Sequence, residues 1–388
     1  MIMDFSLNQQ QIELQRVARE FAQKEMVSVA LEMEENNIPL PKEWLKKYSE
    51  MGFLGINVDK KYGGLGLSNL EALIVIEEFA KISSAVAFPI FESCVGPVKA
   101  IEHFANEDLK MRVIPEVCKG NIIVAVSMSE PNAGSALTDL TTKAELRGDK
   151  IVINGTKRWC SGGGHSEGYV VYCKMSDAPG AKGIGAVYVE KDSKGLSFGL
   201  QESLMGWNGV PSADIFLDSV EVPIENMVVD ADGGFKKLME AFDLERCGNA
   251  TMCLGQASGA LEQVLQYVQE REQFGKPIVE FQAVQMKLAE MAMKVEASRL
   301  LIHRAAHNAE EGFPSIFESS VGKCFSNETA REVVASAMQL MGGYGFNKEY
   351  TMERRYRDVW GWGIAGGTID IQKINIASSM VGKRFNQR

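Results

Sequence analysis

The carboxylate of Glu245 is the best candidate in this sequence for a group that moves a proton. In the helical pattern around residues 239–264 its neighbours at helical spacing are mostly apolar: Leu238, Ala241, Phe242, Asn249 and Met252. Burying a lone carboxylate is costly, and burial raises its pKa. A raised pKa suits a general base that works near neutral pH. The alternative is a structural ion pair between Glu245 and Arg246 or another cation.

Three further patterns resemble catalytic or cofactor motifs but have the wrong context. Residues 164–168 match G-x-S-x-G around Ser166, yet a glycine-rich loop precedes them and a strand pattern follows, which predicts a turn. His303 and His307 are four residues apart without the intervening Glu of a zinc motif, so we expect surface histidines and no metal site. Residues 180–185 lead into a strand, whereas a dinucleotide fingerprint leads into a helix.

Four segments are rich in glycine, small residues and hydrogen-bond donors. They are residues 129–135, 159–164, 271–277 and 339–345. Bare backbone and hydroxyl groups allow a ligand to approach main-chain amides closely. Together with the aromatic ring of Trp159 and the guanidinium of Arg271, these segments predict a large cofactor with phosphates and a flat ring.

Composition limits the class of protein. The 388 residues suggest two or three domains, and 45% hydrophobic with 24% charged residues is typical of a folded globular chain. A net charge of -10 argues against nucleic-acid binding. Residues 1–6 lack a basic segment followed by an apolar run, and no apolar run is long enough for a membrane span, so we expect neither a secretory signal nor a span. Seven scattered cysteines without a Cys-x-x-Cys pair favour reduced thiols and a cytoplasmic location.

The elements that must position these residues follow the order α, β, α. Helices are expected first at residues 7–34 (with Ser6 as a cap), from 41, and at 69–82, 90–104 and 107–117. Strands are expected at 122–126, 142–147, 150–153, 168–174, 185–190 and 213–220. Long helices are expected again at 235–273, 280–309, 316–341 and 368–381. The predicted fold is mainly α with a β middle domain (a small barrel or sandwich) and a helical bundle, divided into domains 1–118, 119–230 and 231–388.

In this order the motifs resemble the acyl-CoA dehydrogenase family over essentially the whole chain. The resemblance is carried by residues 62–66, 129–135, 205–207, 271–275, 339–345, 356–358 and 367–372, with Trp159 and Gln282. It implies an N-terminal helical domain, a β-barrel domain and a C-terminal four-helix bundle. It also implies a homotetramer (a dimer of dimers) that passes electrons to an electron-transferring flavoprotein.

The resemblance implies FAD as the cofactor. The residues that match the family's FAD contacts are Val126, Met128, Ser129, Ser135, Trp159, Ser161, Arg271, Phe274, Gln282, Gln339, Gly342, Gly343, Thr368 and Asp370. Trp159 would pack on the flavin, Ser161 would donate to its N5 atom in place of the more usual Thr, and part of the set would act across a subunit boundary. Asp370 and Asn208 depart from the family pattern, which leaves their contacts open.

The reaction implied is FAD-dependent α,β-dehydrogenation of an acyl-CoA thioester to the enoyl-CoA, with the β-hydride passing to flavin N5. Many relatives carry the base as Glu just before the Gly-Thr of the last motif, where this chain has Gly366. A minority, including isovaleryl-CoA and long-chain enzymes, carry it at the position of Glu245. The resemblance therefore implies that Glu245 removes the α-proton, while Asp243 and Arg246 contact the CoA moiety.

The small residues Ala365 and Gly366 leave room for a branched, cyclic or aryl-substituted acyl group, with Ser135 also at the substrate. Glu92 is a candidate second acid–base group for a cyclic substrate, or else a structural residue. The alternatives left open are a related flavin-dependent oxidase or desulfinase and, from another class, a serine hydrolase using Ser166. Retention of Glu245 favours proton abstraction over the desulfinase.

Overall fold

The N-terminal part of the computed structural model is helical. The structure describes residues 6–310 and 312–385, so most of the segment used to argue against a secretory signal lies outside it. The helices are α1 (Gln9–Asn36), α2 (Lys42–Glu50), α3 (Asn69–Ala80), α4 (Ser84–Cys94), α5 (Pro97–Phe104) and α6 (Glu107–Cys118). The expected cap at Ser6 is wrong: Asn8 is the N-cap, and its side chain and that of Gln11 bond reciprocally to each other's backbone N–H.

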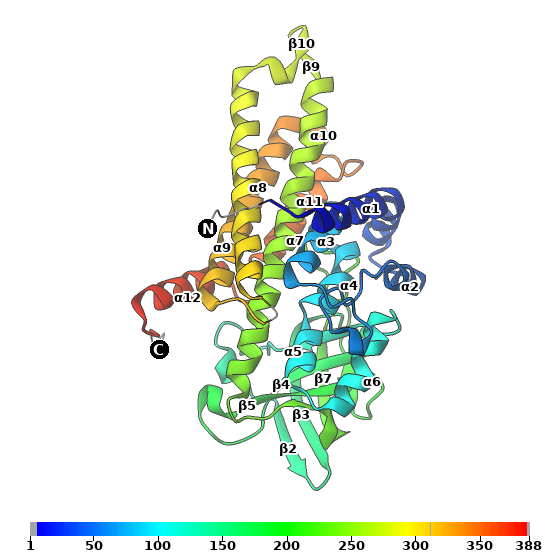
Figure 1. Cartoon of the computed structure of the whole chain (residues 1–388), viewed down its shortest axis with the longest axis vertical. Coiled ribbons are helices and arrows are strands. Elements are labelled where there is room, and N and C mark those ends of the chain that lie inside the picture. Colours follow the sequence, from blue (N-terminus) through cyan, green and yellow to red (C-terminus); the bar gives the residue numbers. More distant parts are fainter. Residues whose placement is uncertain (1–5, 311, 386–388) are drawn as a thin grey trace.

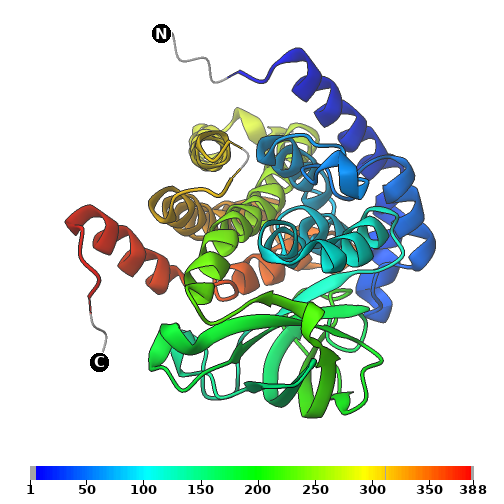
Figure 2. The same cartoon turned by 60° about the horizontal axis from the view of Figure 1, so that its bottom comes forward.

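The middle of the chain forms one sheet at the lower end of the molecule (Figures 1 and 2). Its strands are β1 (Val124–Ser127), β2 (Lys143–Arg147), β3 (Lys150–Ser161), β4 (Gly168–Lys174), β5 (Ile184–Glu190), β6 (Leu196–Phe198), β7 (Ser212–Pro223) and β8 (Met227–Val229). The order is β6-β7-β3-β2-β4-β5-β8, with β1 parallel to β4. The short strands β6 and β8 were not expected, and β3 is much longer than its expected range because it continues through Gly155 and Trp159.

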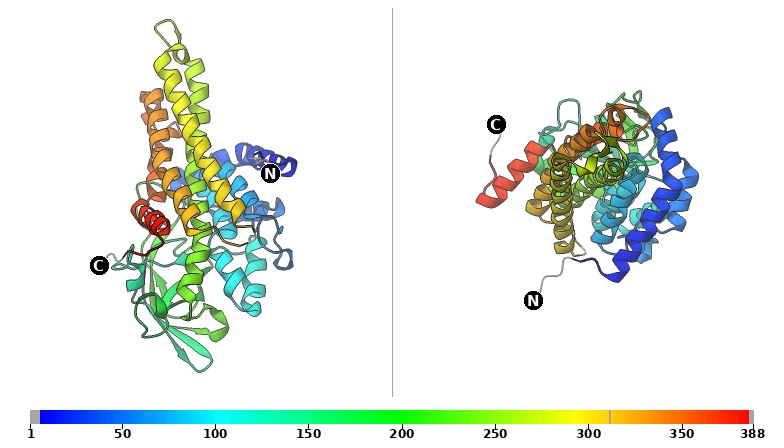
Figure 3. Two further views of the ribbon diagram at one scale, coloured as in Figure 1. Left: turned by 60° about the vertical axis from the view of Figure 1, so that its left-hand side comes forward. Right: turned by 90° about the horizontal axis from the view of Figure 1, so that it is seen from above.

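The C-terminal part contains three long helices that run along the molecule, α7 (Gly234–Glu270), α8 (Gln282–Asn308) and α9 (Ile316–Met341) (Figure 3). The shorter helices are α10 (Gly343–Phe346), α11 (Met352–Trp362) and α12 (Ile369–Val381). Helix α11 was not expected; it packs on α7 and α9, whereas α12 packs on α9 and projects from the body (Figures 1 and 3). A two-stranded ribbon of β9 (Glu272–Gln273) and β10 (Lys276–Pro277) joins α7 to α8.

The observed order of elements confirms the predicted fold class, mainly α with a β middle domain. One expected helix, 90–104, is divided between α4 and α5 because Gly96 lies between them. Five short 3-10 turns lie within residues 6–310 and 312–385: Lys60–Tyr62, Leu137–Asp139, Gly180–Gly183, Ile224–Asn226 and Ile278–Glu280. The domain limits 118/119 and 230/231 remain a prediction; they fall just after α6 and just after β8.

The largest hydrophobic cluster joins α1–α4 to the long helices α7, α8 and α9. A second cluster lies between α5, α6 and the sheet, and a third lies within the sheet. One segment, Ser84–Phe104, has the length and apolar composition of a membrane span, but its apolar window is entirely buried in the protein. All seven cysteines are buried free thiols.

Candidate active site

Glu245 lies on α7 where that helix meets α4, α9 and the sheet. Phe242 and Asn249, three residues before and four residues after it, share its helix face. Its side chain is partly buried, and within the described residues its carboxylate has no hydrogen-bond or ion-pair partner. Burial raises the pKa of Glu245 to about 8, against the lowering effect of Lys323 and Arg246. The side chain therefore has the environment expected of a general base.

Position 366 faces the same space as Glu245. A Cβ on Gly366 would lie 3.5 Å from Asn249 Nδ2, 3.5 Å from Lys323 Nζ and 3.7 Å from Phe242 Cζ. These are ordinary van der Waals distances, so the space beside residue 366 is open to a side chain. Position 366 therefore lies against Phe242 and Asn249, the residues that share the helix face of Glu245.

The loop that carries position 366 is held by a buried lysine of α9. Lys323 Nζ donates to the carbonyl oxygens of Ala365 at 2.5 Å, Gly366 at 3.1 Å and Gly367 at 2.7 Å. The lysine side chain is fully buried. Burial and the nearby Arg246 lower the pKa of Lys323 below its usual range, while Glu245 acts in the opposite direction.

A second carboxylate, Glu92 of α4, approaches Glu245. Glu92 is buried, and its Oε2 atom has no hydrogen-bond partner among the described residues. Burial raises the pKa of Glu92 well above its usual range, and the charge of Glu245 raises it further. Glu92 also affects Cys160 of β3 electrostatically, which places the pair of carboxylates near the β3 strand.

The expected flavin-facing residues of the sheet do come together. Arg158 N donates to Ser129 O at 2.9 Å, and Lys157 Nζ donates to Met128 O at 3.0 Å. Cys160 Sγ donates to Val126 O at 3.3 Å. Residues 126–129 at the end of β1 therefore lie beside residues 157–160 of β3, as a shared wall for a planar ring requires.

Trp159 is presented by an irregularity of β3. The register between β3 and β7 shifts between Lys157 and Cys160, and Trp159 has φ 60°. Bulges of this kind redirect a side chain and are frequent beside active sites. The indole is 52% exposed and is covered on one side by the guanidinium of Arg158, 4.1 Å from the ring centre. A large aromatic surface thus remains open beside residues 126–129.

The two expected hydroxyl residues occupy different places. Ser161 is the last residue of β3, is partly buried and pairs with Ser212 of β7. Ser135 lies in the exposed loop after β1. The base of this loop is fixed by Glu130, which accepts hydrogen bonds from Thr141 N, Thr141 Oγ1 and Thr142 N and pairs with Lys157 at 2.9 Å.

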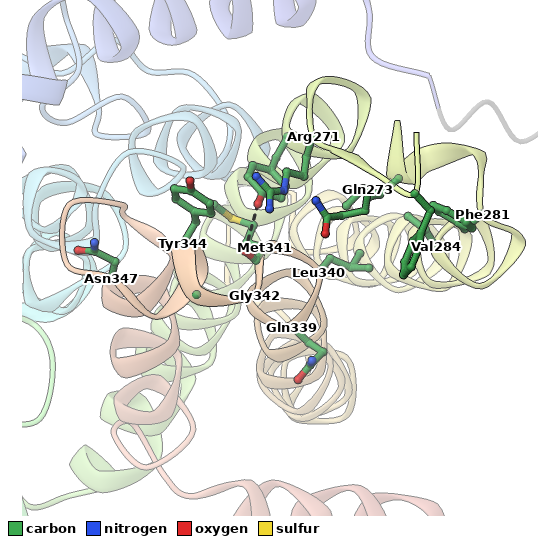
Figure 4. A pocket seen from close by; sticks show the side chains of 14 residues that line it. Arg271, Gln273, Phe281, Val284, Gln339, Leu340, Met341, Gly342, Tyr344 and Asn347 are labelled. Carbon is green, nitrogen blue, oxygen red and sulfur yellow. Dashed lines mark hydrogen bonds between the residues drawn. The ribbon is translucent and has the colours of Figure 1, made fainter. Parts of the chain in front are cut away.

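Five of the other expected cofactor residues line a separate open cavity of about 630 Å³ at the far end of α7 (Figure 4). Arg271, Phe274, Gln339, Gly342 and Gly343 are among its lining residues. The Arg271 guanidinium lies 5.6 Å from the ring centre of Tyr344. A Cβ on either glycine would meet no heavy atom within 4 Å, so a ligand can reach their backbone. Gln282, the first residue of α8, is exposed nearby.

The two groups of cofactor residues are far apart in one chain. Arg271 follows Glu245 by 26 residues along a single helix, which corresponds to about 39 Å at 1.5 Å per residue. This span exceeds the reach of one extended FAD molecule. A single subunit therefore does not assemble the complete set of predicted FAD contacts at one place.

The expected CoA contacts are buried in the structure. Arg246 Nη1 donates to Asp243 Oδ1, which also accepts from Ser319 Oγ at 2.7 Å. Arg246 Nε is buried and lacks a hydrogen-bond partner among the described residues. Thr368 is the N-cap of α12, and Asp370 lies in its first turn.

The residues present fit FAD. A half-exposed indole on a bulged strand and adjacent backbone suit a flat ring, and an arginine beside open glycine backbone suits phosphates. Lys323 was not predicted from the sequence. The available signal was a single cation within a stretch of small residues: Ser319, Ser320, Val321, Gly322 and Cys324. Tyr172 of β4, whose pKa is raised by burial and by Glu245, was also not predicted.

The structure locates the residues of the G-x-S-x-G motif and of the histidine pair. Ser166 lies in the turn between β3 and β4, and a strand follows it where a nucleophile elbow needs a helix. His303 is mostly buried, not a surface residue as expected, and burial lowers its pKa. Among the described residues no cluster of three or more His, Cys, Asp or Glu could hold a metal ion.

Comparison with known proteins assigns the family. The chain matches the acyl-CoA dehydrogenase N-terminal domain at residues 8–121, the middle domain at 125–220 and the C-terminal domain at 232–381. It is 38% identical to acryloyl-CoA reductase (NADH) of Anaerotignum propionicum, over 98% of this chain and 96% of that one. It is 35% identical to 3-sulfinopropanoyl-CoA desulfinase of Variovorax paradoxus, over 99% of this chain and 97% of that one.

A solved structure described as the electron transferring flavoprotein of Acidaminococcus fermentans superposes with a TM-score of 0.94 at 34% identity, covering 98% of this chain and 100% of that one. The matches span nearly the whole chain, and all three domains occur in the family's order. The chain therefore belongs to the acyl-CoA dehydrogenase family, whose members are FAD-dependent oxidoreductases that act on acyl-CoA thioesters.

Proposed function

We propose that this protein oxidises an acyl-CoA thioester to the α,β-enoyl-CoA, with Glu245 as the base that removes the α-proton. The observation that carries the proposal is the unpartnered Glu245 carboxylate in the same space as position 366. FAD, when bound beside Trp159, supplies the acceptor for the β-hydride. A carboxylate of raised pKa is a stronger base than an ordinary glutamate, which favours removal of the α-proton.

The other chain residues would prepare the reaction. Residues 126–129 and Trp159 would form the wall for the ring, with Ser161 as a hydroxyl donor. Asp243 and Arg246 would contact the CoA moiety, and Ser135 would contact the substrate from its exposed loop. Arg271, Phe274, Gln282, Gln339, Gly342, Gly343, Thr368 and Asp370 would complete the FAD contacts.

We propose an acyl group that is branched, cyclic or aryl-substituted. The open volume at Ala365 and Gly366 supports extra bulk near the α- and β-carbons. The indole of Trp362 is buried against Phe91, with ring centres 5.8 Å apart, so it shapes this side of the site from behind. Glu92 would act as a second acid–base group if the substrate is a ring that loses a further proton, because it lies near Glu245 and its Oε2 lacks a partner.

The separation between Glu245 and the Arg271 cavity supports assembly of the site from more than one subunit. We propose that a neighbouring copy contributes residues 271–282 and 339–343, in a homotetramer built as a dimer of dimers. An electron-transferring flavoprotein would accept the electrons, since a relative 34% identical to this chain is named caffeyl-CoA reductase-Etf complex subunit CarC. We propose a cytoplasmic location, consistent with seven free thiols.

Replacing Glu245 by Gln tests the base. Glutamine keeps the size of the side chain but cannot accept the proton, so we expect FAD content and melting temperature near those of the wild type and a rate of flavin reduction lower by roughly 10²–10⁴-fold. Glu240→Gln is the matched control, because Glu240 is a partly exposed residue of the same helix that pairs with Lys236 at 3.7 Å. Substantial turnover by Glu245→Gln with the best substrate would refute the assignment.

Anaerobic flavin bleaching with straight, branched, cyclic and aryl acyl-CoA esters tests the substrate class. We expect a branched, cyclic or aryl ester to give the highest kcat/KM. A preference for a short straight chain would contradict the role given to Ala365 and Gly366.

The same site also supports the reverse reaction, reduction of an enoyl-CoA. A carboxyl group whose pKa is about 8 is mainly protonated at neutral pH, which suits donation of a proton to the α-carbon. One relative is named acryloyl-CoA reductase, which supports considering reduction as well as oxidation. Mixing the reduced holoenzyme with an enoyl-CoA, and separately the oxidised holoenzyme with an acyl-CoA, would decide which direction is faster.

A further inference from the structure

Lys323 is a buried cation with an unusual set of acceptors. All three of its bonds go to consecutive carbonyl oxygens of residues 365–367, at 2.5, 3.1 and 2.7 Å. Three carbonyl acceptors require three N–H donors, which an ammonium group has and a neutral amine does not. The hydrogen bonds therefore favour the charged form of Lys323, although its burial opposes it.

The carbonyls converge because the loop takes an unusual path. Gly366 has φ 67° and Gly367 has φ 81°, so two consecutive residues are left-handed and turn their carbonyls to one side. Converging carbonyl dipoles repel one another unless a donor lies between them. The amides of Asn249 and Gln372 assist, donating to Ala365 O at 3.4 Å and Gly367 O at 2.9 Å, but neither supplies a charge.

The same ammonium acts on the proposed base. Lys323 and Arg246 are the cations that favour ionisation of Glu245, and Glu92 is the anion that opposes it; Tyr172 is the other titratable group coupled to Glu245. Around Lys323 itself the coupled groups are Arg246, Glu245, Cys253 and Cys324. Arg246 is already paired with Asp243, which leaves Lys323 as the cation without a carboxylate partner of its own among the described residues.

We propose that Lys323 is a positioning residue for this reaction: it holds the 365–367 loop beside the substrate space and provides the positive charge that favours the carboxylate form of Glu245. This inference rests on the proposed location of the reaction at Glu245. Lys323 itself is fully occupied by the three carbonyls, so it would not bind the substrate.

The test is an infrared titration of the FAD-loaded enzyme without substrate. The protonated-carboxyl band of Glu245 is identified by its absence in Glu245→Gln, and its pKa is measured in the wild type and in Lys323→Met, Lys323→Gln and Lys323→Arg. We expect Lys323→Met and Lys323→Gln to raise the Glu245 pKa by roughly 1 to 3 units. Lys323→Arg keeps the charge, so the Glu245 pKa should stay close to its wild-type value. The pH profile of flavin reduction should shift with it. Lys99→Met is the matched control, since Lys99 is also buried and donates to Asn57 O at 2.9 Å in another part of the fold.

An unchanged Glu245 pKa in Lys323→Met or Lys323→Gln would overturn the proposal, as would an equal shift in Lys99→Met. If Lys323→Met does not fold, Lys323→Gln carries the test, because it keeps donors without the charge. The titration needs no turnover. It can therefore refute the role of Lys323 while the activity of Glu245→Gln still identifies Glu245 as the base. Conversely, an active Glu245→Gln enzyme would refute the base while leaving the titration result readable.

Discussion

Moving the carboxylate from position 245 to position 366 tests directly whether the two positions face the same substrate space. The double variant Glu245→Gln/Gly366→Glu removes the proposed base and introduces one on the opposite side of the same volume. A side chain at 366 begins 3.5 Å from the Asn249 amide and the Lys323 ammonium, so it enters without a clash. We expect it to recover part of the activity lost in Glu245→Gln.

The cost of this change follows from the backbone. Gly366 has φ 67°, a conformation that costs a non-glycine residue about 1–2 kcal/mol. Removing a glycine restricts the unfolded chain and returns about 0.4–1 kcal/mol. The net loss of about 1 kcal/mol should lower the melting temperature by only about 1 °C in a chain of 388 residues. Recovery of at least tenfold in rate, equivalent to about 1.4 kcal/mol of the barrier, is expected.

The assay is the anaerobic rate of flavin reduction with the best acyl-CoA, normalised to bound FAD. Glu245→Gln/Gly366→Gln is the control, because it has the same side-chain size at 366 without a base. If the double variant is folded and saturated with FAD, yet reduces flavin no faster than this control, positions 245 and 366 do not serve the same substrate carbon.

Three further predictions follow from the described contacts. The rate of flavin reduction should rise with pH through about 8, because only the carboxylate form of Glu245 accepts a proton; a flat profile would contradict the base assignment. Glu130→Gln should lose about 3–5 kcal/mol of stability in chemical denaturation by leaving a buried lysine unpaired, compared with about 0–1 kcal/mol for Glu221→Gln in an exposed pair. Burial works to raise the Glu130 pKa, but its cation and hydrogen bonds lower it to about 2, so this stability should be present above about 4.5 and lost as the pH falls towards 2. Arg271→Ala should lower the FAD content of the purified protein, and full retention would argue against the second cofactor cavity.

Local sequence patterns predicted the helices and strands whose own residues show a clear hydrophobic periodicity. Helix α9 and strand β4 have the expected limits, because helical and alternating periodicity are properties of neighbouring residues. Helix α11 was not expected, because its residues, such as Arg354, Arg355 and Asp358, are polar in sequence and become buried only through contacts with distant helices. The continuation of β3 to Ser161 was not expected either, because its pairing with β7 carries it past Gly155 and a bulge.

The sequence by itself determined the family and the order of domains, and it predicted the exchange of a carboxylate at 366 for one at 245, since these depend on residue types at given spacings along the chain. Only the tertiary structure decided that Glu92 approaches Glu245, that Lys323 reaches three carbonyls of a loop more than 40 residues away, and that the cofactor residues form two separate groups. These contacts join residues that are distant in sequence, and the pKa of a buried group depends on which charges the fold brings near it.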